Sequence, residues 1–474
     1  MIAIINPPNP PNAVSNKDTM GGLGQLYPAG AKHSFPPLDA LYSAAYLRSK
    51  GIPAQVIECL GLNWELAELL LHLNQSRPEL IALRTSAPTF EWDLKIVEII
   101  KLCIQTKILV FGPYATLCAN EILGKSFVDA VILGEPEMAL YEVAAKGEFQ
   151  GCESVWYKDE VATKRNPQRT AIVNLDELPF PAWDMVPYQS YNGLELMRDL
   201  RPFVTSLTSR GCPHGCAYCP YPVAQGRKLR TRSPENVVEE LYWLNESLGV
   251  KAVLFRDPEF AFYKERVVEI CEKIIRRGIR LAWRCETRME DLDEELITLM
   301  ARAGCIGINM GVESTDVDVL RAMKRKPFSL EQAKKIIKTC RKHGIDSFCF
   351  FILGLPGQTK DSAVRTIRHA LELNPDFLQF TVATPYPGTG LREWAEKNKF
   401  IEENSSSAMT GYNVSMRNEH MTSEEIRQLQ WIAQEAKEMQ WRRIGRRLMR
   451  SAFQFGFEIK RCAHFWKERS GMSL

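Results

Sequence analysis

The chain has 474 residues, a net charge of +3 and 45% apolar residues, which are ordinary values for a soluble globular protein and exclude wholesale disorder. This length leaves room for two or three domains. No apolar run is long enough to span a bilayer, and the N-terminal "MIAIINPPNPPN" lacks the basic flank of a signal peptide. We therefore expect a cytoplasmic protein whose thirteen cysteines are buried thiols or metal ligands rather than disulfides.

The charge is concentrated at one end of the chain. Residues 441–474 carry nine Lys/Arg against two acids, a net +7, so residues 1–440 sum to −4. An acidic body with one basic tail argues against a general nucleic-acid-binding protein.

Residues 1–150 alternate short apolar runs with helix-like stretches, which indicates an α/β fold with a doubly wound, Rossmann-like parallel sheet. The expected strands are "MIAIIN", "AQVIE", "ELIALRTS", "TKILVFG" and "AVILG". Ligands of such sheets bind beyond the carboxyl ends of the strands. The loops of interest are therefore "NPPNPPN", "TSAPT", "GPYAT" and "GEPE".

Residues 151–200 contain a hairpin-like stretch and the Pro-rich "DELPFPAWDMVPY", typical of a linker. The alternation restarts within 201–400, where six strand candidates are mostly followed by amphipathic helices. This pattern predicts a partial (β/α)6 barrel with its active site at the carboxyl ends of the strands. Residues 401–474 are expected to form a C-terminal helical region that includes the basic tail.

The stretch "GCPHGCAYCP" brings Cys212, Cys216 and Cys219 together directly after the first strand of this second unit. A structural zinc site normally takes four protein ligands, whereas the next cysteine, Cys271, falls inside an apparent helix. A four-iron cluster can accept three thiolates and keep one iron open. Ligation suits such dense spacing in a Gly/Pro-rich loop better than the alternative of three unrelated packed thiols.

The loop resembles the cluster loop of radical S-adenosylmethionine enzymes, including an aromatic residue before the last cysteine, Tyr218, which the resemblance makes a candidate contact of S-adenosylmethionine. Six further segments recur in the same order in the cobalamin-dependent branch of that family, so the resemblance covers nearly the whole chain. They are "SPENVVEEL", "LFRDPEF", "AWRCETRMEDLDEELITLMARAGC", "GVES", "FILGLPGQT" and "TPYPGT". The resemblance implies a 4Fe–4S cluster whose open iron binds the amino and carboxylate groups of S-adenosylmethionine, with one-electron cleavage giving a 5′-deoxyadenosyl radical.

Four side chains of these segments are candidate ligands of S-adenosylmethionine, each with a structural alternative. Glu313 could accept hydrogen bonds from ribose hydroxyls or act as a capping carboxylate. Asp257 and Glu259 could meet the ammonium group or orient nearby backbone. Arg288 could pair with the methionine carboxylate or form a surface salt bridge with a neighbouring acid.

Two other features of the second unit leave alternatives open. Gly354 would allow the backbone to approach the adenine closely, or it marks a bare turn. Cys285, Cys305 and Cys349 fall on apparent barrel strands, where packing is a better interpretation than hydrogen-atom donation.

The first sheet is the cobalamin-binding domain in the family that the chain resembles. The resemblance makes seven loop residues candidate cobalamin contacts: Ser86 and Thr89 for the nucleotide tail, Gly112, Pro113 and Tyr114 for the ring, and Gly134 and Glu135 in "GEPE". The alternative is a sheet that keeps its shape without the ligand.

The sequence departs from the family at two places. It lacks the Asp-x-His-x-x-Gly loop that supplies a lower axial imidazole in many cobalamin proteins, and His33 stands alone. We therefore expect a cobalt without a histidine ligand. "FGPYAT" has Phe111 and Tyr114 where relatives often have Gly and His, which weakens the assignment there.

The basic tail has an apolar stripe at helical spacing, formed by Trp441, Ile444, Leu448, Ala452, Phe455, Ile459, Cys462 and Trp466. A basic amphipathic helix suits an anionic membrane surface. Packing of the stripe on the barrel is the preferred alternative, since Gly445 and Gly456 weaken a long helix and Phe453 and Phe457 lie off the stripe.

The resemblance implies a methyltransferase acting on an unactivated carbon through the 5′-deoxyadenosyl radical and methylcobalamin. One alternative is radical oxidation, cyclisation or ring rearrangement of a lipid or tetrapyrrole-like substrate. Another is a non-enzymatic zinc or RNA-binding module, which the acidic body disfavours. The expected partners are a small molecule, lipid-like in one interpretation, and an electron donor such as a flavodoxin or ferredoxin. We expect no nucleic acid and consider contact with the inner membrane face through the tail.

Overall fold

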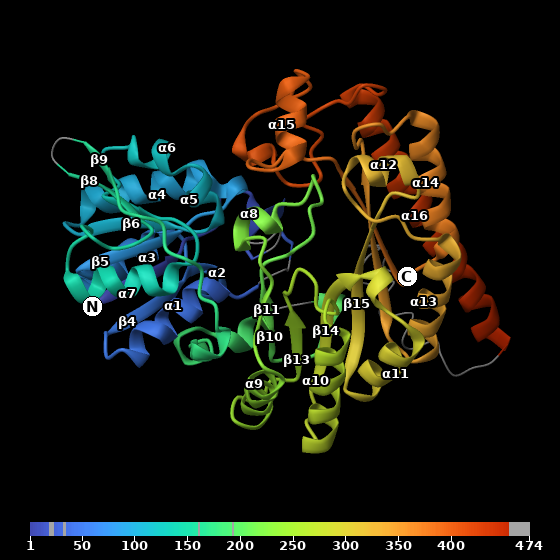
Figure 1. Cartoon of the computed structure of the whole chain (residues 1–474), viewed down its shortest axis with the longest axis horizontal. Helices are drawn as coiled ribbons and strands as arrows, with labels where there is room; N and C mark the ends of the chain where they lie inside the picture. The colour runs from blue at the N-terminus through green and yellow to red at the C-terminus, as the bar shows by residue number, and fades with distance from the viewer. Residues whose placement is uncertain (19–22, 32–34, 160–161, 192–193, 455–474) are drawn as a thin grey trace.

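The computed structural model describes residues 1–18, 23–31, 35–159, 162–191 and 194–454. Two α/β units lie side by side, with the N-terminal unit in blue and teal and the second unit in green to orange (Figure 1). Each unit is built on one parallel sheet, as the alternation of apolar strands and helices predicts.

The first sheet has seven strands in the order β4-β1-β5-β6-β7-β8-β9 and is parallel from β4 to β7. Its parallel strands are β1 (Ile2–Asn6), β4 (Ala54–Glu58), β5 (Leu80–Arg84), β6 (Lys107–Phe111) and β7 (Ala130–Ile132). The helices between and after them are α1 (Leu38–Ser49), α2 (Cys59–Leu62), α3 (Leu66–Ser76), α4 (Phe90–Cys103), α5 (Pro113–Leu117), α6 (Ala119–Leu123) and α7 (Pro136–Lys146). The sheet order reverses at β1, which confirms the predicted doubly wound topology.

The hairpin expected in the linker is part of this first sheet. Strands β8 (Val155–Lys158) and β9 (Thr163–Arg165) continue the sheet antiparallel to β7. The first unit therefore extends past the boundary predicted at residue 150, because β7 would otherwise leave an open edge.

A second hairpin lies between β1 and α1 and was not predicted. Strands β2 (Ala13–Asn16) and β3 (Gln25–Pro28) pair antiparallel. The ammonium of Lys17 lies 2.7 Å from the Asp93 carboxylate with both side chains buried. The Ala87 N–H donates to the Leu23 carbonyl at 2.8 Å. The hairpin thus covers the carboxyl end of β5.

The second sheet has six parallel strands whose order in space follows the chain, as predicted for a partial (β/α)6 barrel. They are β10 (Phe203–Ser206), β13 (Ala252–Phe255), β14 (Ala282–Arg288), β15 (Cys305–Glu313), β16 (Asp346–Leu353) and β17 (Phe377–Val382). The helices of this unit are α8 (Tyr221–Gln225), α9 (Pro234–Glu246), α10 (Lys264–Arg277), α11 (Glu294–Arg302), α12 (Val317–Ala322), α13 (Leu330–Lys342), α14 (Lys360–Leu373) and α15 (Gly390–Lys397).

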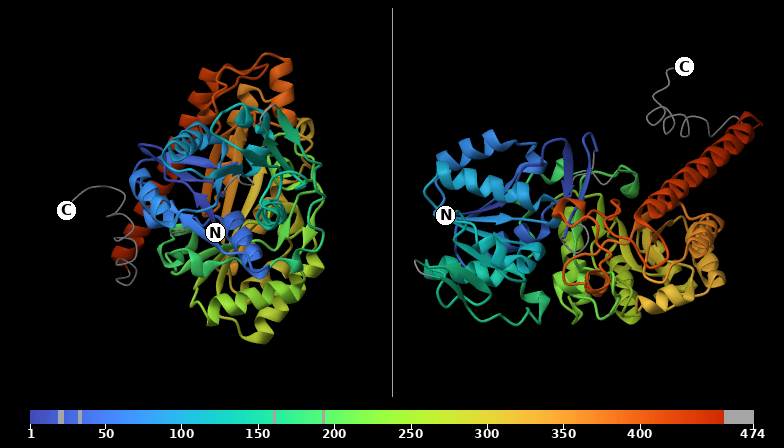
Figure 2. Two further views of the ribbon diagram at one scale, coloured as in Figure 1. Left: turned by 90° about the vertical axis from the view of Figure 1, so that its left-hand side faces the viewer. Right: turned by 90° about the horizontal axis from the view of Figure 1, so that it is seen from above.

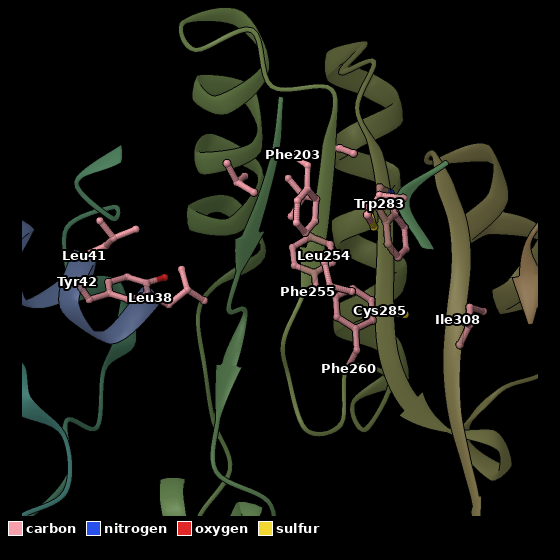
Figure 3. Packing of buried hydrophobic residues seen from close by; sticks show 14 of the residues in the cluster. Leu38, Leu41, Tyr42, Phe203, Leu254, Phe255, Phe260, Trp283, Cys285 and Ile308 are labelled. Carbon is pink, nitrogen blue, oxygen red and sulfur yellow. The ribbon is translucent and has the colours of Figure 1, made fainter. Parts of the chain in front are cut away.

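One apolar core spans both units. Figure 3 shows Leu38 and Tyr42 of α1 on one side and Phe203 and Leu254 of the second sheet on the other. The ring of Phe35 meets Phe203 edge-on at 5.7 Å between centroids. This shared core sets the carboxyl ends of the first sheet against the start of the second.

The last helix of the described residues is α16 (Ser423–Gln454), whose first half packs against α14 and β17 through Ile426 and Leu429. Its second half extends away from the body (Figure 2). Trp431 and Met439 are 65% and 56% exposed. The predicted stripe that starts at Trp441 falls outside the side chains that the structure describes, and no helix in the described part of the chain is long and apolar enough to cross a membrane.

Glu58 ends β4 and gives the first unit a pH-dependent stability. Its buried carboxylate accepts hydrogen bonds from the Asn6 side chain at 2.7 Å and the Gly61 N–H at 3.0 Å. Burial raises the pKa of Glu58 from 4.5 to about 7, although these donors oppose the rise. The folded-state pKa therefore lies above that of the unfolded chain, so stability is greatest below about pH 4.5 and is lost as the pH rises through 7.

We expect Glu58→Gln to remove this pH dependence. A pKa rise from 4.5 to about 7 is worth roughly 3 kcal/mol of unfolding free energy. Urea unfolding at pH 5 and pH 8.5 measures the effect. Between these two pH values the unfolding free energy of the wild type should fall by roughly 3 kcal/mol more than that of the variant. The exposed Glu91→Gln is the matched control, and equal pH profiles for wild type and Glu58→Gln would contradict the assignment.

Candidate active site at the junction of the two sheets

The three cysteines lie in a loop that a short antiparallel ribbon closes at its base. Strands β11 (Ser209–Arg210) and β12 (Arg230–Thr231) pair with Arg210 opposite Arg230. We call residues 211–229 the cluster loop. Gly211 has a φ of +87°, and a Cβ there would lie 2.2 Å from the Lys228 carbonyl oxygen, so only glycine allows the two ends of the loop to meet.

The thiols of the cluster loop are protonated in the absence of a metal. Burial, which is the main cause, raises the pKa of Cys212 to about 11 and also raises the pKa of Cys216 and Cys219. The neighbouring thiols add to the rise for Cys212 and Cys219. A metal that binds here must therefore displace protons, and its positive charge supplies the driving force.

The spacing of the sulfurs favours a cluster over a single ion. A tetrahedral zinc with sulfur bonds of 2.3 Å needs sulfurs about 3.8 Å apart. The group formed by His214, Glu259 and Asp291 has its ligand atoms within 4.8 Å of one another, and the three cysteines form no such group. A cubic iron–sulfur cluster places its thiolates further apart than one ion does, so the arrangement of the thiols is compatible with the predicted 4Fe–4S cluster.

The cluster loop is braced from the carboxyl ends of the second sheet. The Ala217 N–H donates to the Met323 carbonyl at 2.9 Å, and the Leu391 N–H donates to the Ala217 carbonyl at 2.8 Å. Beside this brace, Glu313 ends β15 with a φ of +67°. Burial raises the pKa of Glu313 to about 7, and the Tyr218 hydroxyl and Arg288 oppose the rise. Two predicted ligands of S-adenosylmethionine, Tyr218 and Glu313, are thus brought together beside the cysteines.

Glu259 and Arg288, both predicted, meet two residues that the sequence analysis did not select. A guanidinium nitrogen of Arg288 lies 2.9 Å from Nδ1 of His214. Glu259 accepts hydrogen bonds from the Arg288 N–H at 2.8 Å and from the Thr287 hydroxyl. Burial raises the pKa of Glu259, and it also raises the pKa of Asp291.

This charged group fits the amino-acid end of S-adenosylmethionine. Nε of Arg288 and one carboxylate oxygen of Asp291 are buried and make no hydrogen bond with any described residue. A guanidinium donor suits a carboxylate, and the buried carboxylate of Glu259 beside the half-buried carboxylate of Asp291 suits an ammonium group. The arginine beside His214 makes the group a poor site for a bare cation.

Asp257 adopts the second of its two predicted roles. Its carboxylate accepts hydrogen bonds from the Thr208 N–H at 3.1 Å, the Thr208 hydroxyl at 2.8 Å and the Ser209 hydroxyl. It thereby anchors the chain just before the cluster loop, with both carboxylate oxygens bonded within the protein.

Gly354 also has an internal neighbour. A Cβ on this residue would lie 2.9 Å from Cδ1 of Ile426 in α16, at a φ of +83°. The glycine therefore allows the backbone at residue 354 to lie close to α16. An adenine contact from its backbone stays a prediction.

A small open cavity of about 90 Å³ lies between the two sheets. Gly112, Pro113, Gly134 and Glu135 line it from the carboxyl ends of β6 and β7, as the sequence predicts for a cobalamin site. Tyr221, in the helix that directly follows Cys219, lines it from the second unit. The cavity thus separates the first sheet from the cluster loop.

The structure does not bring three predicted cobalamin contacts to this cavity. The Ser86 and Thr89 hydroxyls bond each other at 2.8 Å, and Thr89 donates to Asp93 at 2.6 Å. A Cβ on Gly24 would lie 2.8 Å from the Ser86 hydroxyl oxygen, so the β2–β3 hairpin covers both residues. Tyr114 is buried against Phe90 at 5.1 Å between ring centroids. The family resemblance suggested these three residues, and in the structure their side chains pack against other residues of the first unit.

The cavity walls fit a corrinoid. One carboxylate oxygen each of Asp18 and Glu137 is buried without a hydrogen-bond partner among the described residues, and both residues line the cavity. A corrin ring carries carboxamide side chains that can donate to such oxygens. A Cβ on Gly134 would meet nothing within 4 Å. The described lining residues include no imidazole, thiol or thioether for the cobalt, and His33 lies outside the described residues.

The strand thiols lie in the packed core. Cys285 and Cys349 are fully buried, and Cys305 is 4% exposed. Burial raises the pKa of Cys285, and its neighbours include Cys305 and the helix residue Cys271. These contacts agree with packing, the preferred interpretation of the sequence.

Comparisons with known proteins extend the description of the site. Residues 206–370 match the family model of the Radical SAM superfamily. The chain is 30% identical over 401 residues to an uncharacterized methyltransferase of Pyrococcus horikoshii, covering 83% of this chain and 86% of the relative. It is 25% identical over 372 residues to the anaerobic magnesium-protoporphyrin IX monomethyl ester cyclase of Rubrivivax gelatinosus, covering 76% of this chain and 66% of the cyclase.

The fold is shared with a solved structure of the radical S-adenosylmethionine methyltransferase TsrM from Kitasatospora setae, with cobalamin and a [4Fe-4S] cluster bound. The TM-score is 0.68 at 18% identity, and the match covers 90% of this chain and 81% of TsrM. The likeness therefore includes the first sheet as well as the cluster-bearing unit. The chain belongs to the radical S-adenosylmethionine superfamily.

Proposed function

We propose that the protein is a cobalamin-dependent radical S-adenosylmethionine methyltransferase acting on an unactivated carbon of a small molecule. The observation that carries the proposal is the shared wall between the two predicted cofactor sites. Tyr221, Ala224 and Gln225 of α8 follow the last cysteine directly and line the cavity whose opposite wall is the glycine-rich edge of the first sheet. A corrinoid in the cavity would lie next to the cluster loop.

The chain's own residues supply binding, orientation and charge. Cys212, Cys216 and Cys219 would hold the cluster, and Glu259, Asp291 and Arg288 would hold the ends of the methionine moiety. When bound, the cluster supplies the electron for cleavage of S-adenosylmethionine, and the corrinoid carries the methyl group.

The second unit contributes a polar group of side chains beside the cavity. Glu286 accepts hydrogen bonds from Tyr221 at 3.3 Å, from Asn309 at 3.4 Å and from Arg256. Tyr221 and Arg256 line the cavity and both bind Glu286, so this polar group can orient a substrate that enters between the two cofactors.

A second candidate function is radical oxidation or cyclisation without methyl transfer. The similarity to the Rubrivivax cyclase favours it, since that relative is named for a ring-forming reaction. The two functions need the same cluster and cavity, so the products of S-adenosylmethionine distinguish them.

Three finer proposals concern partners. The substrate is lipid-like, in keeping with the apolar Trp431, Ile432 and Met439 that α16 exposes beside the basic tail. The same helix contacts the anionic inner face of the membrane. A small electron donor such as a flavodoxin or ferredoxin reduces the cluster.

The test is product analysis under anaerobic conditions with a low-potential reductant and S-adenosylmethionine. We expect S-adenosylhomocysteine that depends on added hydroxocobalamin, together with 5′-deoxyadenosine. 5′-Deoxyadenosine without S-adenosylhomocysteine would favour the second function. If neither product formed with a loaded cluster, both proposals would be wrong.

A further inference from the structure

The two ends of the cluster loop are tied to the wall of the cavity by one carboxylate. Arg230 binds Glu135 through two hydrogen bonds of 2.7 and 3.0 Å. Arg210, its partner across the β11–β12 ribbon, lies 3.4 Å from the same carboxylate and 2.7 Å from Glu137. Both arginine side chains are at least nine-tenths buried, with exposures of 3% and 8%. A bidentate, desolvated guanidinium–carboxylate contact has one favoured geometry.

The connection continues from these arginines into the loop that holds the cysteines. Arg230 also donates to the Gln225 carbonyl at 3.1 Å. The side chain of Gln225 accepts the Gly211 N–H at 3.2 Å, and the Cys212 N–H donates to the Gly226 carbonyl at 3.1 Å. Hydrogen bonds and the short chain segments between them therefore connect Glu135 to the backbone of the first cluster cysteine.

Glu135 is at the same time a fixed part of the cavity wall. Glu135 lies between Gly134 and the first residue of α7. The Gly134 N–H donates to the Thr116 hydroxyl at 2.9 Å. Glu135 lines the cavity with both of these neighbours. Because Arg210 and Arg230 outweigh the effect of burial, the pKa of Glu135 is lowered and the carboxylate stays charged at neutral pH.

We propose that Glu135, Arg210 and Arg230 are positioning residues that make the binding of the iron–sulfur cluster and the corrinoid cooperative. This inference rests on the proposed function. A cluster bound by the cysteines of residues 211–229 would hold the two ends of the loop together and so stabilise the contacts of both arginines with Glu135. A corrinoid that packs against this wall then finds it pre-organised, and by thermodynamic reciprocity its binding stabilises the cluster loop.

The test is the affinity of the full-length chain for hydroxocobalamin, measured anaerobically by fluorescence quenching with and without a reconstituted cluster. We expect the cluster to tighten corrinoid binding by about tenfold in the wild type. Glu135→Gln should bring the ratio of the two dissociation constants close to one. Arg230→Lys keeps the charge but loses the bidentate contact, so it should reduce the ratio of the two dissociation constants similarly. This second variant keeps the test valid if Glu135→Gln does not fold.

The matched control is Asp129→Asn, which removes a carboxylate paired with Lys101 at 2.6 Å. Asp129 lies directly before β7, whereas Glu135 lies beyond its other end, so the control alters the same strand away from the cavity. It should keep the tenfold ratio. A wild-type ratio of one, or an unchanged ratio in both variants, would overturn the inference while leaving the proposed function intact. If no form bound hydroxocobalamin, the proposed function itself would fail.

Discussion

Replacing Cys216 with alanine removes the iron from the reconstituted protein and lowers the rate of S-adenosylmethionine cleavage by at least about a thousandfold, equivalent to roughly 4 kcal/mol of activation free energy. The reason is the size of the donor set. The cluster loop offers three thiols. Its imidazole, His214, is already within 2.9 Å of Arg288, and the carboxylate of Glu259 is held by neighbouring groups. With one thiolate lost, two remain, too few to hold four irons.

Iron analysis by mass spectrometry and chromatographic assay of 5′-deoxyadenosine measure these two effects. Cys103→Ala is the matched control, since it removes an exposed thiol of α4 that is far from the loop in the sequence. It should retain iron and activity. A Cys216→Ala protein that still holds about four irons would show that the cluster is bound elsewhere.

Gly112→Ala should destabilise the first unit and abolish corrinoid binding. Gly112 has φ 118° and ψ 162°, a region that is essentially restricted to glycine. A Cβ there would lie 2.5 Å from the Thr85 carbonyl oxygen, a backbone atom that cannot move aside cheaply. We expect a loss of roughly 2–4 kcal/mol of unfolding free energy from strain and crowding together.

Gly134→Ala provides the comparison, because Gly134 also lines the cavity at a positive φ of +76° but its added Cβ would meet nothing within 4 Å. It should cost only about 1–2 kcal/mol. Thermal unfolding and hydroxocobalamin titration of the two variants give the measurement. If both substitutions lowered the unfolding free energy equally, crowding against the Thr85 carbonyl oxygen would not be the cause of the loss in Gly112→Ala.

Features that are local in the sequence could be predicted from it. The strands of both sheets are short apolar runs between helices, and their order followed from that alternation. Cys212, Cys216 and Cys219 lie within eight consecutive residues, so their spacing alone indicated ligation. Glycines at strand ends likewise marked the loops that line the cavity.

Features that depend on distant contacts could not be predicted. The β2–β3 hairpin has strands of only four residues, and the Lys17–Asp93 pair that helps to hold it joins positions 76 residues apart. Because this hairpin covers Ser86, a loop position that looked suitable for a ligand is buried. His214 and Asp291 approach Glu259 from separate elements, and the contact of Glu135 with Arg230 spans 95 residues. No periodicity or spacing carries such information.

The central claim is that one chain carries both a three-thiolate cluster and a corrinoid in adjoining sites. The most direct test is an anaerobic ultraviolet–visible spectrum with iron, cobalt and zinc analysis after reconstitution with iron, sulfide and hydroxocobalamin. We predict about four irons and a retained corrinoid per chain, with little zinc. Iron without corrinoid would leave the first sheet without its proposed ligand, and stoichiometric zinc without iron would contradict the account of the cluster loop.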